Sequence, residues 1–134
     1  GVHLGKNDMP ITEAREILGD SFIIGSTVNS FEDILRNLQH AVPDYFGCGP
    51  FRFTSTKKNL SPILGVEGYL NIIHQMRDSH IYVPLIAIGG IGKNDILPLL
   101  ESGVNGFALS GSVLHADNPI KEMDELMNLI QTKY

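Results

Sequence analysis

Residues 83–111 read VPLIAIGGIGKNDILPLLESGVNGFALSG and contain two apolar runs, each of which ends at glycine. The runs, 83–90 and 105–111, are continuous rather than alternating, which is typical of strands buried in a parallel sheet. Between them, residues 95–101 have a helical pattern that ends before Gly103, and glycine commonly follows the last turn of a helix. This segment therefore predicts a strand–helix–strand unit.

The same unit recurs toward the N-terminus. Further apolar runs that end on or beside glycine lie at 1–5, 21–27 and 44–50. Helical patterns separate the runs, and Ser30 and Asn118 are suitable N-caps for two of these helices. The predicted helices are 12–18, 31–39, 67–77, 95–101 and a last helix that begins at Pro119. We expect five strands, covered on both faces, in one α/β domain that spans residues 1–134.

Two parallel architectures fit this alternation, a doubly wound sheet and a (β/α)8 barrel (TIM barrel). A complete barrel needs roughly 200 residues or more, whereas the chain has 134. The chain also begins at Gly1 on an apolar run rather than at Met, so we expect a segment upstream of it. Because an open sheet of this kind exposes apolar faces, we expect association with that segment or with a second copy, a homo-oligomer.

Composition narrows the classes of partner. Ten basic and 15 acidic residues give a net charge of −5, which disfavours binding to nucleic acid or to an anionic membrane surface. No apolar run has the length of a membrane span. The single cysteine, Cys48, excludes an internal disulfide and a cysteine-based metal cage. We expect a cytoplasmic protein whose partners are small molecules.

Two glycine-containing turns follow the last two predicted strands, where parallel α/β proteins bind their ligands. They are Gly89-Gly90 and Ser110-Gly111-Ser112. Glycine lets backbone N–H groups approach a phosphate closely. A tight turn between strand and helix explains the same glycines, but two such turns on neighbouring strands favour a phosphate site.

The segment 47–58, GCGPFRFTSTKK, also carries groups suited to an anion. Thr54, Ser55 and Thr56 offer hydroxyl donors, and Lys57 and Lys58 add positive charge. A solvated polar loop is the alternative interpretation.

Asp8 follows the first predicted strand and suits Mg²⁺, which one or two carboxylates and substrate phosphates usually hold. A turn or helix-cap role is the alternative for a lone loop aspartate.

Five motifs together span the chain: GVHLGKND (1–8), ILGDSFIIGSTVNS (17–30), DYFGCGPFRFTSTKK (44–58), VPLIAIGGI (83–91) and GFALSGSV (106–113). They resemble the thiamine-phosphate synthase (thiamine-phosphate pyrophosphorylase) family. The resemblance implies a TIM barrel of which residues 1–134 are the carboxy-terminal part, with strands 4–8. It also implies a Mg²⁺-dependent transferase of thiamine biosynthesis, which condenses hydroxymethylpyrimidine diphosphate with a thiazole phosphate to give thiamine phosphate and diphosphate.

The resemblance also assigns roles to residues. It implies that Asp8 binds the metal and that Lys57 is catalytic. Thr27 and Lys57 would contact the pyrimidine diphosphate. The thiazole phosphate would be held by Thr54, Ser55, Thr56, Gly90, Ser110 and Gly111. Because further motifs of the family lie upstream of the matching strands, residues 1–134 alone are expected to be inactive.

Two other functions are compatible with parts of this pattern. A thiazole tautomerase paralogue resembles the synthase closely but has a histidine in the loop after the sixth barrel strand, where this chain has Pro50. A non-catalytic relative that binds a phosphate ligand would need neither Asp8 nor Lys57. The retention of both residues favours the enzyme.

Overall fold

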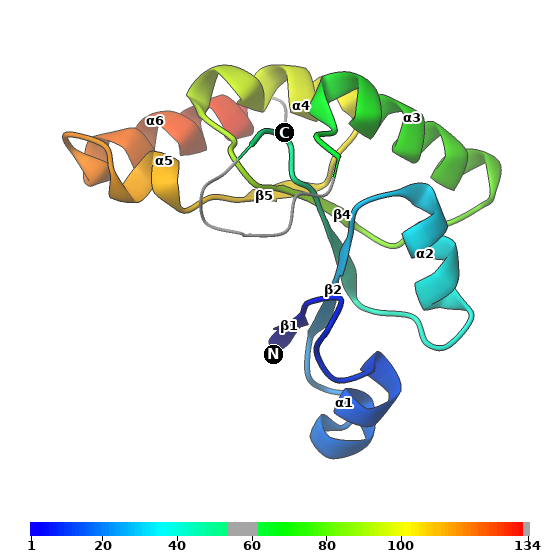
Figure 1. Cartoon of the computed structure of the whole chain (residues 1–134). Helices are drawn as coiled ribbons and strands as arrows, with labels where there is room; N and C mark the ends of the chain where they lie inside the picture. Colours follow the sequence, from blue (N-terminus) through cyan, green and yellow to red (C-terminus); the bar gives the residue numbers. More distant parts are fainter. Residues whose placement is uncertain (54–61, 133–134) are drawn as a thin grey trace.

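The computed structural model describes residues 1–53 and 62–132, which form strands and helices in alternation (Figure 1). The strands are Val2–Leu4 (β1), Ile24–Val28 (β2), Tyr45–Cys48 (β3), Leu85–Ile88 (β4) and Gly106–Ala108 (β5). The α-helices are Ile11–Leu18 (α1), Phe31–Leu38 (α2), Gly65–Asp78 (α3), Ile96–Ser102 (α4), Gly111–Leu114 (α5) and Pro119–Gln131 (α6). A 3₁₀ turn, Lys93–Asp95 (η1), precedes α4. The predicted strands and the five predicted helices are confirmed, with small differences at their ends.

Local capping explains where several helices begin and end. The Ser30 hydroxyl accepts the Asp33 N–H at 3.2 Å, and the Asn118 side chain accepts the Lys121 N–H at 3.0 Å. Both contacts satisfy a backbone donor that the first helical turn leaves unpaired. Gly103 ends α4 with φ of +100°, a conformation that favours glycine.

The five strands form one parallel sheet in the order β1-β2-β3-β4-β5. A doubly wound sheet reverses its strand order at a switch point, and its helices cover both faces. Here the order follows the sequence, and α2, α3, α4 and α6 lie along one side of the sheet (Figure 1). This order and this one-sided cover are typical of a TIM barrel and differ from a doubly wound sheet.

The main core lies between the outer face of the sheet and these helices. Phe46, Leu85 and Ala87 of the sheet are buried there. The helices contribute buried apolar residues, among them Ile34, Tyr69, Ile72, Leu99, Leu100 and Leu126. A smaller cluster of Ile11, Ala14 and Ile24 fixes α1.

The expectation that the strands are covered on both faces is wrong for most of the sheet. Only β2 is buried along its whole length. In β4, Leu85 and Ala87 are buried whereas Ile86 and Ile88 are only partly so, and β1 and β5 contain no buried residue. One reason is that β1 and β5 are the edge strands of the sheet. Another is that the ends of β4 and β5 border a cavity, with Ile88 and Ala108 in its wall.

Two details at the carboxyl ends of strands differ from the predicted pattern. Helix α4 begins one residue later than expected, because the Asp95 carboxylate accepts the Gly92 N–H at 2.8 Å and η1 forms first. Helix α5 is not predicted. It has only four residues, which are too few to show a helical period in the sequence, and the Ser110 side chain does not cap it.

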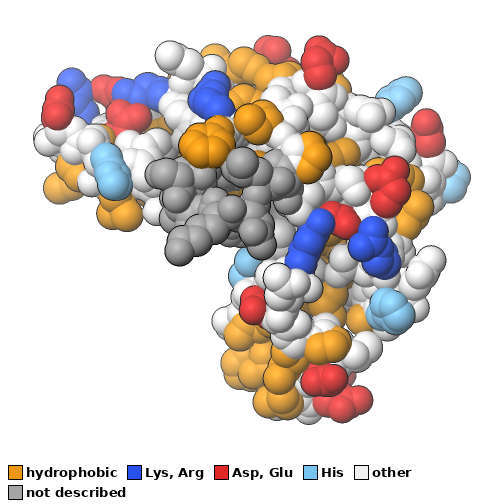
Figure 2. Space-filling view, viewed as in Figure 1, with side chains coloured by type: hydrophobic (Ala, Val, Ile, Leu, Met, Phe, Trp, Pro, Cys, Tyr) orange, Lys and Arg blue, Asp and Glu red, His pale blue; other side chains and the backbone are white. Residues whose placement is uncertain are grey.

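Exposed apolar residues gather around α1 and β1, at the lower end of the molecule in Figure 2. Ile17, Phe22 and Ile23 belong to this group, with exposed fractions of 68%, 47% and 60%. Among residues 1–53 and 62–132, no helix combines the length and the apolar character that crossing a bilayer requires.

Candidate functional site

The carboxyl ends of the strands surround a cavity of about 1090 Å³, called the main cavity below. Five of the predicted site residues border it: Asp8, Thr27, Gly90, Ser110 and Gly111. They come from the loops or ends of β1, β2, β4 and β5, so residues far apart in sequence meet at one place. The other four, Thr54, Ser55, Thr56 and Lys57, lie outside the described residues.

The glycines after β4 are required by the backbone. Gly89 and Gly90 have φ of +86° and +75°, which L side chains rarely adopt. A Cβ at Gly89 would lie 3.0 Å from the Pro50 Cα, and one at Gly90 would lie 3.0 Å from the Arg52 carbonyl oxygen. The sequence left open whether these glycines serve a tight turn, and the structure confirms that they do. The same turn borders the main cavity, where a phosphate site is expected.

The turn after β5 differs, because packing does not require its glycine. A Cβ at Gly111 would have no atom within 4 Å among its described neighbours. Next to it, the Ser112 hydroxyl is buried and has no hydrogen-bond partner in the described part of the chain. Buried hydroxyls are nearly always paired. Ser112 also lines the main cavity.

Asp8 has the turn role considered for it, and it also lies at the main cavity. Its Oδ2 accepts the Gly5 N–H at 2.6 Å, which closes a turn after β1. Asp8 is exposed and borders the main cavity. Within residues 1–53 and 62–132, no group of three or more His, Cys, Asp or Glu side chains could enclose a metal. One carboxylate fits magnesium bound mainly through substrate phosphates, which is its usual mode in phosphate-transfer sites.

Thr27 lies on β2, 7% exposed, with its hydroxyl 2.9 Å from Nε2 of His3. Nδ1 of His3 is in turn 3.0 Å from the Tyr45 hydroxyl. A chain of polar groups from β3 through β1 therefore holds the threonine at the cavity. The sequence pattern does not single out His3 or Tyr45, because each lies within an apolar run.

Two glycines make room for these rings. In the sheet register, Gly25 of β2 lies between His3 and Tyr45, whose rings stack with centroids 5.5 Å apart. A Cβ at Gly25 would lie 2.1 Å from Cζ of Tyr45, and one at Gly47 would lie 2.6 Å from Cε1 of His3. Glycine inside a strand often marks such a close approach. The glycines at positions 25 and 47 are therefore the signal in the sequence for the close approach of His3 and Tyr45.

Of the residues that the structure describes, two lysine or arginine side chains border the main cavity, and each is paired with a carboxylate. Lys6 pairs with Asp33, and Arg52 pairs with Asp95. Burial by itself raises the pKa of both carboxyls. Hydrogen bonds from Lys6 and Arg52, respectively, and from backbone N–H groups outweigh it and leave each pKa below its ordinary value. Both carboxylates are therefore charged at neutral pH.

Residues 1–113 match the family model described as thiamine monophosphate synthase. The chain belongs to this family. Among its curated relatives, the thiamine-phosphate synthase of Bacteroides thetaiotaomicron is 56% identical over 129 residues, which are 96% of this chain and 61% of that protein. The thiamine-phosphate synthase of Bacteroides fragilis is 57% identical over 130 residues, 96% of this chain and 63% of that protein.

Solved structures agree with membership of the thiamine monophosphate synthase family. The thiamine phosphate pyrophosphorylase from Pyrococcus furiosus superposes with a TM-score of 0.82 at 33% identity, over 98% of this chain and 59% of that one. A 3-hexulose-6-phosphate synthase superposes with a TM-score of 0.60 at 14% identity, over 96% of this chain and 60% of that one, and shows likeness of fold alone. The chain thus spans about three fifths of the length of the curated relatives it matches.

Proposed function

We propose that the protein is a thiamine-phosphate synthase, a transferase of thiamine biosynthesis. Its substrates would be hydroxymethylpyrimidine diphosphate and a thiazole phosphate, and its products thiamine phosphate and diphosphate. The observation that carries this proposal is the meeting of five predicted site residues at the main cavity. Thiamine-phosphate synthases that are 56–57% identical over 96% of the chain support it.

The main cavity offers two ends for two phosphorylated substrates. At one end, the turns with Gly90 and with Ser110-Gly111 border the cavity. The Ser112 hydroxyl, which has no hydrogen-bond partner among residues 1–53 and 62–132, lies nearby. We assign this end to the thiazole phosphate, together with Thr54, Ser55 and Thr56. At the other end, Asp8 and Thr27 border the cavity beside Lys6. We assign this end to the pyrimidine diphosphate, with Lys57.

In the proposed reaction, the bond between the pyrimidine methylene carbon and the diphosphate oxygen breaks, and the thiazole nitrogen forms a bond to that carbon. The bond's electron pair leaves with the diphosphate, so groups that stabilise negative charge there lower the barrier. Lys57 would supply such a charge. Asp8 would hold magnesium, which when bound adds positive charge at the diphosphate oxygens. No side-chain nucleophile is required.

We also propose that residues 1–134 are the carboxy-terminal five units of a (β/α)8 barrel, strands 4–8. The sequential strand order and the one-sided helices support this assignment. The matched share of the relatives, 59–63%, agrees with five units of eight. A cytoplasmic location is also proposed, because the single cysteine, Cys48, cannot form an internal disulfide.

The test is product formation by the purified full-length protein. With both substrates and Mg²⁺, we expect thiamine phosphate and equimolar diphosphate, separated and measured by chromatography, and none after chelation of the metal. Isomerisation of the thiazole phosphate without pyrimidine diphosphate would instead identify a tautomerase. Tight binding of the thiazole phosphate without any product would identify a non-catalytic binder.

A further inference from the structure

Asp33 is a buried carboxylate in the first turn of α2, and only 7% of the residue is exposed. Its neighbour Glu32 is an exposed acid of the same turn. A buried charge is costly unless it is paired and hydrogen-bonded. The contacts of Asp33 therefore indicate what the burial achieves.

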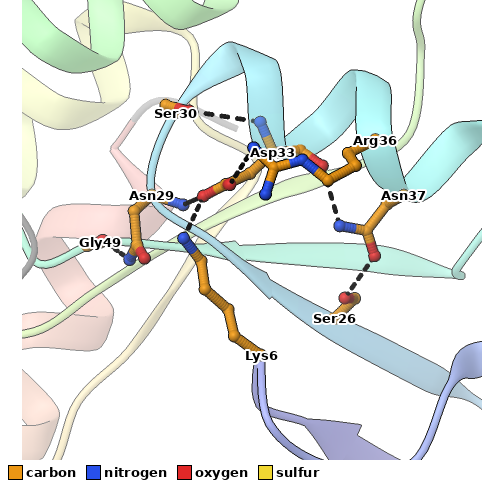
Figure 3. A network of polar contacts seen from close by, with 8 residues as sticks. All are labelled: Lys6, Ser26, Asn29, Ser30, Asp33, Arg36, Asn37 and Gly49. Carbon is orange, nitrogen blue, oxygen red and sulfur yellow. Dashed lines mark hydrogen bonds and ion pairs between the residues drawn. The ribbon is translucent and has the colours of Figure 1, made fainter.

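Figure 3 shows Asp33 at the centre of a polar network. One carboxylate oxygen, Oδ2, pairs with the Lys6 ammonium and accepts the Asn29 N–H at 2.9 Å. The other, Oδ1, lies 3.5 Å from the Arg36 guanidinium. Both oxygens thus face cations or donors.

This network joins the carboxyl ends of three neighbouring strands. Lys6 belongs to the loop after β1, two residues before Asp8, and Asn29 follows β2 directly. The side-chain amide of Asn29 then donates to the Gly49 carbonyl, which follows β3 (Figure 3). One carboxylate is therefore linked, directly or through one residue, to all three loops.

Asp33 itself is held firmly. Asn37 donates to the Asp33 carbonyl at 2.9 Å, and its amide oxygen accepts the Ser26 hydroxyl of β2 at 2.8 Å. Helix α2 is thus fixed to the strand beneath it. Lys6, Asn29 and Gly49 border the main cavity, whereas Asp33 borders only a smaller neighbouring pocket of about 250 Å³. Any effect of Asp33 on the cavity passes through these other residues.

We propose that Asp33 is a positioning residue, which fixes the loop that carries Asp8 and the Gly49 turn relative to each other at the rim of the diphosphate site. This inference rests on the proposed function. Simple electrostatics predicts the opposite effect for the same residue. Removal of a negative charge near an anion site should strengthen anion binding, whereas loss of a positioning contact should weaken it. The sign of the change therefore separates the two explanations.

The decisive variant is Asp33→Asn in the full-length protein, with Glu32→Gln as the matched control. Both remove one negative charge from the same helical turn, but only the first removes the ion pair with Lys6. The probe is inorganic diphosphate with MgCl₂, titrated by calorimetry. We expect Asp33→Asn to bind about tenfold more weakly, as for other residues that orient metal ligands. Glu32→Gln should bind as the unmodified protein does.

Amide hydrogen exchange gives a second readout that does not depend on diphosphate. Residues 4–9 and 49–53 should exchange several-fold faster in Asp33→Asn than in Glu32→Gln, while α3 and α4 stay protected. Equal or tighter diphosphate binding by Asp33→Asn, or unchanged exchange in both loops, would overturn the inference. If the unmodified protein binds no diphosphate, the proposed function fails, and the exchange comparison alone then decides the role of Asp33.

Should Asp33→Asn fail to fold, Asp33→Glu replaces it. Glutamate keeps the charge but displaces the carboxylate by one methylene. Weaker binding with faster exchange of residues 4–9 would support positioning, because the charge is unchanged. Binding and exchange identical to those of the unmodified protein would contradict it.

Discussion

Arg52 and Asp95 form a bidentate ion pair, with both guanidinium–carboxylate contacts at 2.9 Å. Arg52 borders the main cavity. Arg52 also donates to the Gly90 carbonyl at 3.1 Å. Asp95 accepts the Gly92 N–H at 2.8 Å. The pair therefore ties the chain after β3 to the glycine turn after β4, where we place the thiazole phosphate.

Replacement of Arg52 by alanine should raise the KM for the thiazole phosphate, because the Gly89-Gly90 turn loses its tether. Stability should fall little, about 1 kcal/mol or less, since 57% of the arginine side chain is exposed. Steady-state kinetics and urea unfolding measure the two effects. The control is Lys121→Ala, which removes a cation that pairs with Glu125 on α6. A KM equal to that of the control would contradict the tether.

Replacement of Lys57 by alanine in the full-length protein should lower kcat strongly. The lost charge would otherwise stabilise the departing diphosphate, and such electrostatic contacts contribute about 3 kcal/mol or more to catalysis. Thermal unfolding should be unchanged, and Lys58→Ala is the matched control for charge. Full turnover of Lys57→Ala at saturating substrate would show that this lysine has no part in the chemistry.

The stability contributed by Asp33 should depend on pH in a defined direction. Its pKa in the folded protein lies below the ordinary value of 3.8. Its contribution is therefore complete above that value and is lost as the pH falls through the lower, folded value. The difference in free energy of unfolding between the unmodified protein and Asp33→Asn should shrink from pH 6 to pH 3. Chemical denaturation at several pH values measures it. A difference that grows on acidification would reverse the assigned sign.

Gly25→Ala should destabilise the protein by about 1–3 kcal/mol, the usual cost of overpacking. The new methyl group would lie 2.1 Å from a ring carbon of Tyr45. Gly111→Ala, where no described atom lies within 4 Å, is the control and should leave stability nearly unchanged. Urea denaturation compares them. The double variant Gly25→Ala/Tyr45→Ala removes the obstructing ring, so its stability should exceed the value expected from adding the two single effects.

Residues 1–134 alone should form no thiamine phosphate, because the proposed barrel assignment places further diphosphate ligands on earlier strands. Inorganic phosphate should still bind near Gly90 and Ser110-Gly111, since those turns need no upstream partner. Product assays on this chain and on the full-length protein, with phosphate titration by calorimetry, measure both. Product formation by the shorter chain would refute the assignment of essential groups to earlier strands.

The sequence predicted the features that local signals determine. The apolar runs located the strands, and the caps at Ser30, Asn118 and Gly103 located helix ends, because each of these depends on a few adjacent residues. The position of Asp8, Thr27 and the glycine turns at one cavity also follows, since all lie at the same ends of parallel strands.

Features that depend on strand register and helix rotation could not be predicted in this way. Glu32 and Asp33 are equivalent acids in sequence, and only the rotation of α2 on β2 buries the second one. His3 lies on β1 and Tyr45 on β3, far apart in the sequence. They meet only because the strand register places Gly25 of β2 between them. The expected cover on both faces of the sheet failed for a related reason, because an apolar residue does not specify which surface it contacts.

The sequential order of the strands has a consequence for how the chain assembles. Within residues 1–53 and 62–132, each strand pairs only with strands adjacent to it along the chain. Because every pair is parallel, a helix separates its two strands along the chain, and such pairing forms more slowly than a hairpin. During synthesis, each newly emerged strand can add to the edge formed by the previous one, and its helix then seals the outer face. The last strand to form is thus the edge of the sheet on which the next strand pairs, in the direction of translation.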